Sequence, residues 1–156
     1  MSINDAVFGE LEFNGYDWIG NKSINFSGKE SKVSLIIRGE DNGKFEVEQY
    51  TAYNSLIDKW DQLKQEILEP ILDYYTQTRK DLGYDVEFNA NYPLIETTDQ
   101  LIEKITLVGI FIADKELLEF LDIGLMFDCT WDLENGLGLC LIEGEVTEIG
   151  YQDVVI

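Results

Sequence analysis

The first forty residues alternate apolar and polar positions between closely spaced turn signals, which is typical of antiparallel strands. The alternation predicts strands over residues 7–13, 16–26 and 33–38, with a potential interruption of the second at Gly20-Asn21. Asn14-Gly15 is a strong signal for a tight turn between the first two strands. Ser27-Gly28-Lys29 predicts the turn into the third strand. We therefore interpret this part of the chain as an antiparallel meander.

From about Glu48 the spacing of apolar residues changes to three and four, which is the period of one helical face. The residues on this face are Tyr53, Leu56, Ile57, Trp60, Leu63, Ile67, Ile71, Tyr74 and Tyr75. Pro70 lies inside the pattern, where it removes one backbone donor. We expect a kinked helix, or two abutting helices with the break near Glu69, ended by Gly83 as the C-terminal cap.

The second half predicts a loop, a short helix and a second set of strands. Asn89, Asn91 and Pro93 mark residues 84–96 as a loop, and Thr97-Thr98-Asp99 is an N-cap region for a helix to about Lys104. Strands are predicted over residues 106–112, 121–131, 137–142 and 146–151. The whole chain, residues 1–156, is thus predicted as one α+β domain: about seven antiparallel strands in an N-terminal and a C-terminal meander, packed with one long kinked helix and one short helix.

Hydrophobic matching suggests a register for the last three strands, because a buried face must stay apolar. It pairs Trp131 with Leu137, and across a three-residue turn at 143–145 it sets Leu139 opposite Ile149. On the other face, the same register aligns Asp128, Cys140 and Glu148 in one row. It also places Cys129 and Cys140 on opposite faces, so both are expected to remain reduced thiols.

The composition is that of a globular protein, with 45% hydrophobic, 12% aromatic and 27% charged residues in a length of 156. The N-terminus has no basic region followed by an apolar run, so no secretory signal is predicted. The most apolar stretch, residues 105–113, is about half as long as a membrane helix. The sequence has only two cysteines, so it does not suggest a disulfide framework. Together these features lead us to expect a cytoplasmic protein.

The net charge of −20 is concentrated toward the C-terminus. Residues 84–156 contain 16 acidic and two basic residues, and no cation follows Lys115. Nucleic acids and anionic membranes need neutralising cations, so both are disfavoured as partners. A basic protein is favoured instead, although acidity also serves solubility alone. The predicted contact residues are Asp132, Glu134, Glu143, Glu145, Glu148 and Asp153, with Asp128 a lesser candidate.

The sequence lacks the residues that several common catalytic mechanisms require. The sequence has no histidine, no phosphate-binding loop, no dinucleotide fingerprint and no Cys-x-x-Cys pair, so we expect a non-enzymatic protein without a cofactor. One alternative is a carboxylate-based hydrolase that uses Asp128 and Glu148. Another is a small-ligand or divalent-metal module. Residues 132–135 and 41–43 offer oxygen ligands, but neither has the spacing of a calcium loop, so no metal ligand is assigned.

Residues 131–138, Trp-Asp-Leu-Glu-Asn-Gly-Leu-Gly, are followed by Gly144 and by Gly150-Tyr151-Gln152-Asp153. This tail resembles the C-terminal signature of a family of small acidic bacterial proteins that is a domain of unknown function. Residues 8–12 and 60–64 are similar to its N-terminal half. The resemblance implies no catalytic residues. By analogy with other small acidic proteins, it suggests an immunity protein that masks a basic toxin, which agrees with the charge distribution.

Overall fold

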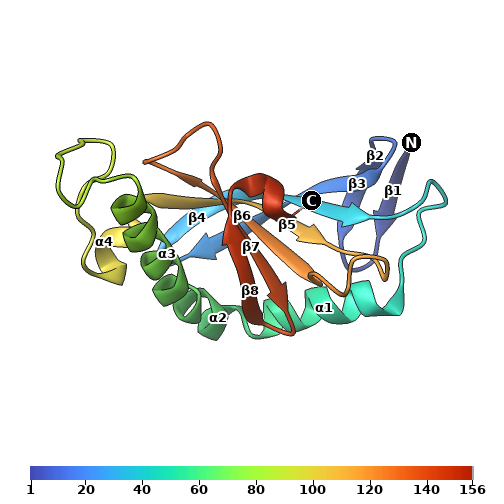
Figure 1. Cartoon of the computed structure of the whole chain (residues 1–156). Coiled ribbons are helices and arrows are strands. Elements are labelled where there is room, and N and C mark those ends of the chain that lie inside the picture. The colour runs from blue at the N-terminus through green and yellow to red at the C-terminus, as the bar shows by residue number, and fades with distance from the viewer. Residues whose placement is uncertain (156) are drawn as a thin grey trace.

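The computed structural model describes residues 1–155 and confirms the α+β class (Figure 1). The strands are β1 (Ser2–Asp5), β2 (Gly9–Phe13), β3 (Asp17–Phe26), β4 (Lys29–Arg38), β5 (Ile105–Ile112), β6 (Ile123–Cys129), β7 (Leu137–Ile142) and β8 (Glu145–Gly150). The helices are α1 (Val47–Asp58), α2 (Trp60–Glu66), α3 (Leu68–Asp81), α4 (Thr98–Ile102) and a 3-10 helix, η1 (Gln152–Val155).

All eight strands form one sheet in the order of the sequence, β1 to β8. Every neighbouring pair is antiparallel except β4 and β5, which run parallel. The expectation of a purely antiparallel arrangement is therefore corrected to one mixed sheet, and β1 is a strand that the sequence did not predict. The parallel pair arises because α1 to α4 separate β4 from β5, and such a long crossover returns the chain in the same direction.

The helices cover one face of the sheet, as Figure 1 shows for α1, α2 and α3, which follow one another along it. Their buried residues join those of the sheet in the main core, which includes Trp60, Ile71, Leu35 and Phe127. A smaller cluster on the opposite face contains Phe111, Met126, Cys140 and Val155. Strands β5 to β7 are buried on both faces of the sheet, and they are accordingly almost continuously apolar.

The predicted long helix is interrupted twice, at Lys59 and at Ile67. The second break lies two residues before the predicted one, so that Pro70 falls in the first turn of α3, where a missing N–H is tolerated. The predicted cap at Gly83 is confirmed: its φ is +83°, and the N–H of Tyr84 donates to the carbonyl of Arg79 at 2.9 Å. The predicted short helix is also confirmed, with Thr97 as its N-cap.

The register of β6 with β7 differs from the predicted one. Leu137 lies opposite Phe127, not opposite Trp131. Alternating apolar residues match equally well after a slip of four residues, so hydrophobic matching alone does not distinguish the two registers. The register of β7 with β8 is confirmed from Gly138 to Cys140, with Leu139 opposite Ile149, but it shifts by one residue between Cys140 and Leu141. The loop between these strands has two residues, Glu143 and Gly144, because Ile142 already pairs with Glu145.

The C-terminal segment packs over two glycines on the face opposite the helices. A Cβ at Gly138 would lie 2.6 Å from the carbonyl oxygen of Tyr151, and one at Gly124 would lie 2.6 Å from Val155 Cβ. The side-chain amide of Gln152 donates to the carbonyl of Phe127 at 2.7 Å and holds η1 on β6. Small residues in β6 and β7 thus make room for the end of the chain.

Two expectations concern the cysteines and the membrane. Cys129 belongs to the main core and Cys140 to the cluster on the opposite face, which confirms their predicted separation, and both are free thiols. None of the helices within residues 1–155 has the length and apolar character needed to span a membrane.

Candidate functional site

A cavity of about 400 Å³ lies between helices α1 and α2 and the hairpin formed by β7 and β8. Its floor is apolar, because Leu56, Leu63, Ile123 and Leu141 line it and are buried. In Figure 1 the turn of the hairpin reaches down to the junction of the two helices. The helices come from the first half of the chain and the hairpin from its end, so only the folded sheet brings these segments together.

The rim of this cavity is acidic. Four carboxylates line it, those of Glu66, Asp122, Glu143 and Glu145, together with a single cation, Lys59. Like charges around a cavity with low-dielectric walls concentrate a negative potential in it. The arrangement therefore attracts a cationic group whose stem is apolar, such as the side chain of lysine or arginine.

Asp122 is the most constrained of these acids. Its backbone N–H donates to the carbonyl of Leu141 at 2.9 Å, and its Oδ2 accepts the N–H of Glu143 at 2.9 Å. Burial raises the pKa of its carboxyl, and the nearby charge of Glu143 acts in the same direction, while backbone hydrogen bonds partly oppose the shift. A cation bound in the cavity would stabilise the ionised form of Asp122.

The hairpin turn presents Glu143 at a cost in backbone strain. Glu143 has φ +50° and Gly144 has φ +82°, so both central residues are left-handed, as a type I′ turn requires. This turn favours Asn or Gly at its first central position, whereas a side chain such as Glu is disfavoured there. The sequence thus keeps a carboxylate at a position where local conformational preference would select another residue.

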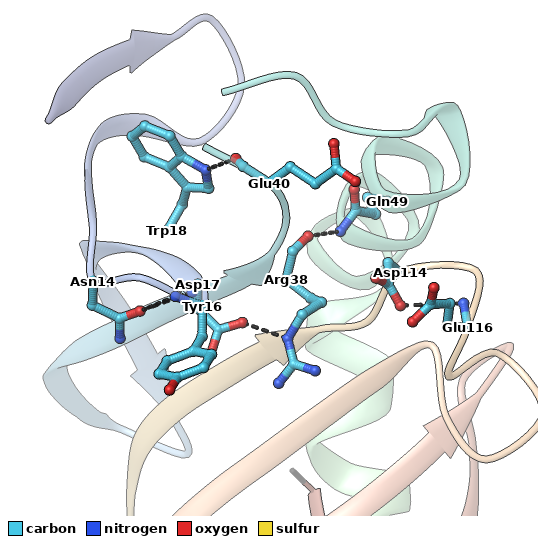
Figure 2. Close-up of polar contacts among 9 residues, drawn as sticks. All are labelled: Asn14, Tyr16, Asp17, Trp18, Arg38, Glu40, Gln49, Asp114 and Glu116. Carbon is cyan, nitrogen blue, oxygen red and sulfur yellow. Dashed lines mark hydrogen bonds and ion pairs between the residues drawn. The ribbon is translucent and has the colours of Figure 1, made fainter. Parts of the chain in front are cut away.

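The two salt bridges found within residues 1–155 both lie in the first half of the chain. Arg38, at the end of β4, donates from Nε to Asp17 at 2.6 Å, as Figure 2 shows. Its guanidinium also lies over the ring of Phe111, at 5.3 Å from the centroid. Lys64 pairs with Asp61 at 3.2 Å. Within residues 1–155, no salt bridge joins a cation to any of the seven acids predicted as contact residues.

The polar groups around Arg38 have a structural role. The side-chain amide of Gln49, which is buried, donates to the carbonyl of Arg38 at 2.7 Å. The indole N–H of Trp18 donates to the carbonyl of Glu40 at 2.7 Å (Figure 2). These bonds connect the end of β4 to α1 and to β3. They satisfy backbone carbonyls that would otherwise lack partners where the strand ends.

The structure does not gather the seven predicted acids in one place. Glu143 and Glu145 line the cavity under the hairpin, whereas Asp132 lines a second cavity beside α3. Four others are exposed outside both cavities: Asp128, Glu134, Glu148 and Asp153. Glu66 and Asp122 were not predicted. No sequence signal marks them, because each becomes part of the cavity only through packing of distant segments.

The row of Asp128, Cys140 and Glu148 is not formed. Cys140 lies opposite Glu148 on β8 but opposite Gly124 on β6, and Asp128 lies four residues farther along β6, beside Thr106 of β5. Strand geometry then separates Asp128 from Glu148 by roughly 16 Å. That distance exceeds the separation of paired carboxylates in glycosidases. Asp128 and Glu148 are therefore too far apart to act as the catalytic pair that the sequence suggested.

Other ligand groups are not clustered. Within residues 1–155, no group of three or more His, Cys, Asp or Glu side chains is arranged to hold a metal ion. Burial raises the pKa of Cys140, and the charge of Glu148 adds to the shift. Burial also raises the pKa of Cys129, to about 11. Both thiols are therefore protonated at neutral pH, which is unfavourable for a nucleophile.

Residues 7–156 match the family described as a domain of unknown function (DUF6985). The chain belongs to this family. The resemblance inferred from the tail is thereby confirmed at the level of an uncharacterised family. No curated protein and no solved structure matches the chain. In this member of the family, the cavity under the hairpin combines an apolar floor with an acidic rim.

Proposed function

We propose that this protein is a non-enzymatic acidic binding protein that captures a basic segment of a protein partner beneath the β7–β8 hairpin. One observation carries the proposal: four carboxylates and a single lysine surround a cavity with an apolar floor. The proposed role is that of a cytoplasmic immunity or inhibitor protein. Its partner would be a basic protein such as a bacterial toxin, masked when its cationic residues are bound.

The chemistry of the cavity supports this class of partner. A lysine or arginine side chain can lay its methylene stem on Leu56 and Ile123 while its charged head meets Glu143 and Glu145. Binding then relieves repulsion among neighbouring carboxylates, including that of the half-buried Asp122. An anionic ligand would add to this repulsion, which disfavours phosphates and nucleic acids.

The strained turn supports a binding role for Glu143 in particular. A non-glycine residue in a left-handed conformation costs about 1 to 2 kcal/mol relative to one in the right-handed region. Such strain is characteristic of positions where function rather than stability selects the residue. At Glu143 the strained backbone directs a carboxylate to the rim of the cavity.

The test uses a fluorescent decalysine peptide as a defined basic probe. Its affinity is measured by fluorescence anisotropy at about 20 and 200 mM salt. Binding should weaken at the higher salt because ions screen the charges. Glu143→Gln with Glu145→Gln should weaken binding about tenfold or more at low salt, since each carboxylate contributes on the order of 1 kcal/mol to a cation held in a partly buried site.

The matched control is Asp85→Asn with Glu87→Gln, which removes the same charge from an exposed loop outside the cavity. If this control weakened binding as much as the hairpin variant, overall charge and not the cavity would attract the peptide. The proposal is overturned by that result, or by an affinity that does not change with salt.

A further inference from the structure

A second cavity of about 400 Å³ lies between α3 and the loop that joins β6 to β7. Its lining combines aromatic rings with carboxylates. The residues that carry this character are Tyr74, Tyr92, Trp131, Tyr151, Asp81 and Asp132. No lysine or arginine lines the cavity, and the acidic cavity under the hairpin shares none of its residues.

The walls on the sheet side are built by the two parts of the tail motif. Trp131 and Asp132 precede β7, whereas Tyr151 follows β8. The parts are held together by hydrogen bonds, because the N–H of Gln152 donates to the carbonyl of Asn135 at 3.0 Å. Asp132 caps the loop by accepting the N–H of Asn135 at 3.1 Å. The cavity is therefore preorganised on this side.

Two of the lining rings pack against Tyr75, which is buried and does not itself line the cavity. Tyr75 of α3 packs between neighbours, with its ring centroid 4.6 Å from that of Trp131 and 6.4 Å from that of Tyr92. Its hydroxyl donates to the carbonyl of Pro93 and thus holds the 84–96 loop against α3. Nε of Arg79 donates to the carbonyl of Tyr92 at 3.0 Å.

Tyr74, Tyr92, Tyr151 and Asp132 line the same cavity. Burial raises the pKa of Tyr74 and that of Tyr92, and the charge of Asp132 and the phenol of Tyr151 raise both further. Tyr74 and Tyr92 therefore remain neutral over the physiological range. The cavity is thus lined by four aromatic residues and by the carboxylates of Asp81 and Asp132, and no salt bridge within residues 1–155 neutralises either carboxylate.

We infer that this cavity binds an organic cation through an alkylated ammonium head group. The faces of tyrosine and tryptophan rings attract cations, and an aromatic enclosure with a carboxylate is the usual site for quaternary and methylated ammonium. An alkylated ammonium is less strongly hydrated than a primary one, so its transfer into an aromatic cavity costs less, and its methyl groups pack against the rings. Two sources share this chemistry: a free small molecule such as choline, and a methylated lysine side chain of a peptide.

Isothermal titration calorimetry of the full chain tests the inference with tetramethylammonium, choline and a trimethyllysine peptide. The expected result is saturable binding of tetramethylammonium and at least one of the other two. Tighter binding of choline would identify a free small molecule as the source, and tighter binding of the peptide a modified protein. The neutral isostere of choline, 3,3-dimethylbutanol, should bind at least tenfold more weakly, because it lacks the charge.

Two variants locate the site without disturbing the fold. Asp132→Asn keeps an oxygen that can accept the N–H of Asn135 but removes the charge, and Tyr151→Ala removes a ring that is 52% exposed. Each should weaken tetramethylammonium binding about tenfold. The matched controls are Glu134→Gln in the same loop and Tyr16→Ala at a distant turn, and these should leave the affinity unchanged.

The inference is overturned if none of the three cations binds, if the neutral isostere binds equally well, or if Asp132→Asn and Tyr151→Ala bind like their controls. It does not depend on the function proposed for the hairpin cavity. Glu143→Gln with Glu145→Gln should leave tetramethylammonium binding intact, so that failure of either proposal is recognised separately.

Discussion

The backbone N–H of Glu143 donates to Oδ2 of Asp122 at 2.9 Å and so connects the β7–β8 turn to the residue that precedes β6. This bond brings two carboxylates to the rim of one cavity. Because burial raises the pKa of Asp122, its ionised form is disfavoured in the folded protein. Binding of a cation in the cavity is therefore linked to deprotonation of the Asp122 carboxyl.

The first prediction concerns Asp122→Asn. The pKa of Asp122 is higher in the folded protein than in the unfolded chain. Protonated Asp122 therefore contributes stability that is fully present at a pH below the unfolded-state pKa and is lost as the pH rises through the folded-state pKa. The amide stays neutral and still offers an oxygen to Glu143. At pH 7 the variant should therefore be more stable than the original protein. Urea unfolding at pH 7 and pH 3.5 checks this: the difference should shrink at the lower pH. A variant less stable at pH 7 would contradict the prediction.

The second prediction concerns the strained turn. Glu143→Asn should raise the free energy of unfolding by about 0.5 to 1 kcal/mol, because Asn adopts the left-handed region more readily. It should also weaken decalysine binding by removing a rim carboxylate. Glu145→Asn is the control, because it removes a rim charge from a strand position without relieving strain. Equal changes in stability for the two variants would argue against strain at Glu143.

The third prediction concerns the packing of η1. Gly138→Ala would place a Cβ 2.6 Å from the carbonyl of Tyr151 and should destabilise the protein by about 1 to 3 kcal/mol, measured by thermal unfolding. Gly150→Ala is the control, because its Cβ would meet Val154 at 3.5 Å, an ordinary contact. If the two variants had similar midpoints, the C-terminal helix would not be held on the sheet as described.

The fourth prediction concerns Lys29, whose ammonium donates to the carbonyl of Ile105 at 3.0 Å and to that of Ile102. The bonds join the β3–β4 hairpin to the end of α4. Lys29→Met keeps the stem but leaves both carbonyls without this donor, and should cost about 1 to 3 kcal/mol of stability in urea unfolding. Lys32→Met, at an exposed position of β4, should have little effect. Equal losses would indicate a general charge effect.

The fifth prediction concerns the two cysteines. Burial raises the pKa of Cys129 to about 11 and also raises that of Cys140, so few thiolates form at pH 8. Iodoacetamide should label both residues slowly in the native protein and rapidly in 8 M urea, as mass spectrometry would show. Rapid native labelling of Cys140 would mean that η1 does not cover it as the structure has it.

Local patterns in the sequence were sufficient for most elements. The spacing of apolar residues identified the helical region between Val47 and Asp81. Thr97 correctly marked the start of α4 and Gly83 the end of α3, because capping depends on residues close in the chain. The separation of Cys129 from Cys140 also followed from strand alternation, which is a local property. The expected membership of an uncharacterised family is confirmed by the match over residues 7–156.

Tertiary structure alone decided the rest. The parallel pairing of β4 with β5 and the register of β6 with β7 depend on which distant segments meet, and periodic apolar residues fit several registers equally well. The same holds for the two cavities. The sequence determined an acidic tail without compensating cations. Only packing brought Glu143 and Glu145 together with Glu66 and Asp122, and placed Asp132 in a cavity lined by aromatic residues, because each cavity forms between elements that are far apart in the sequence.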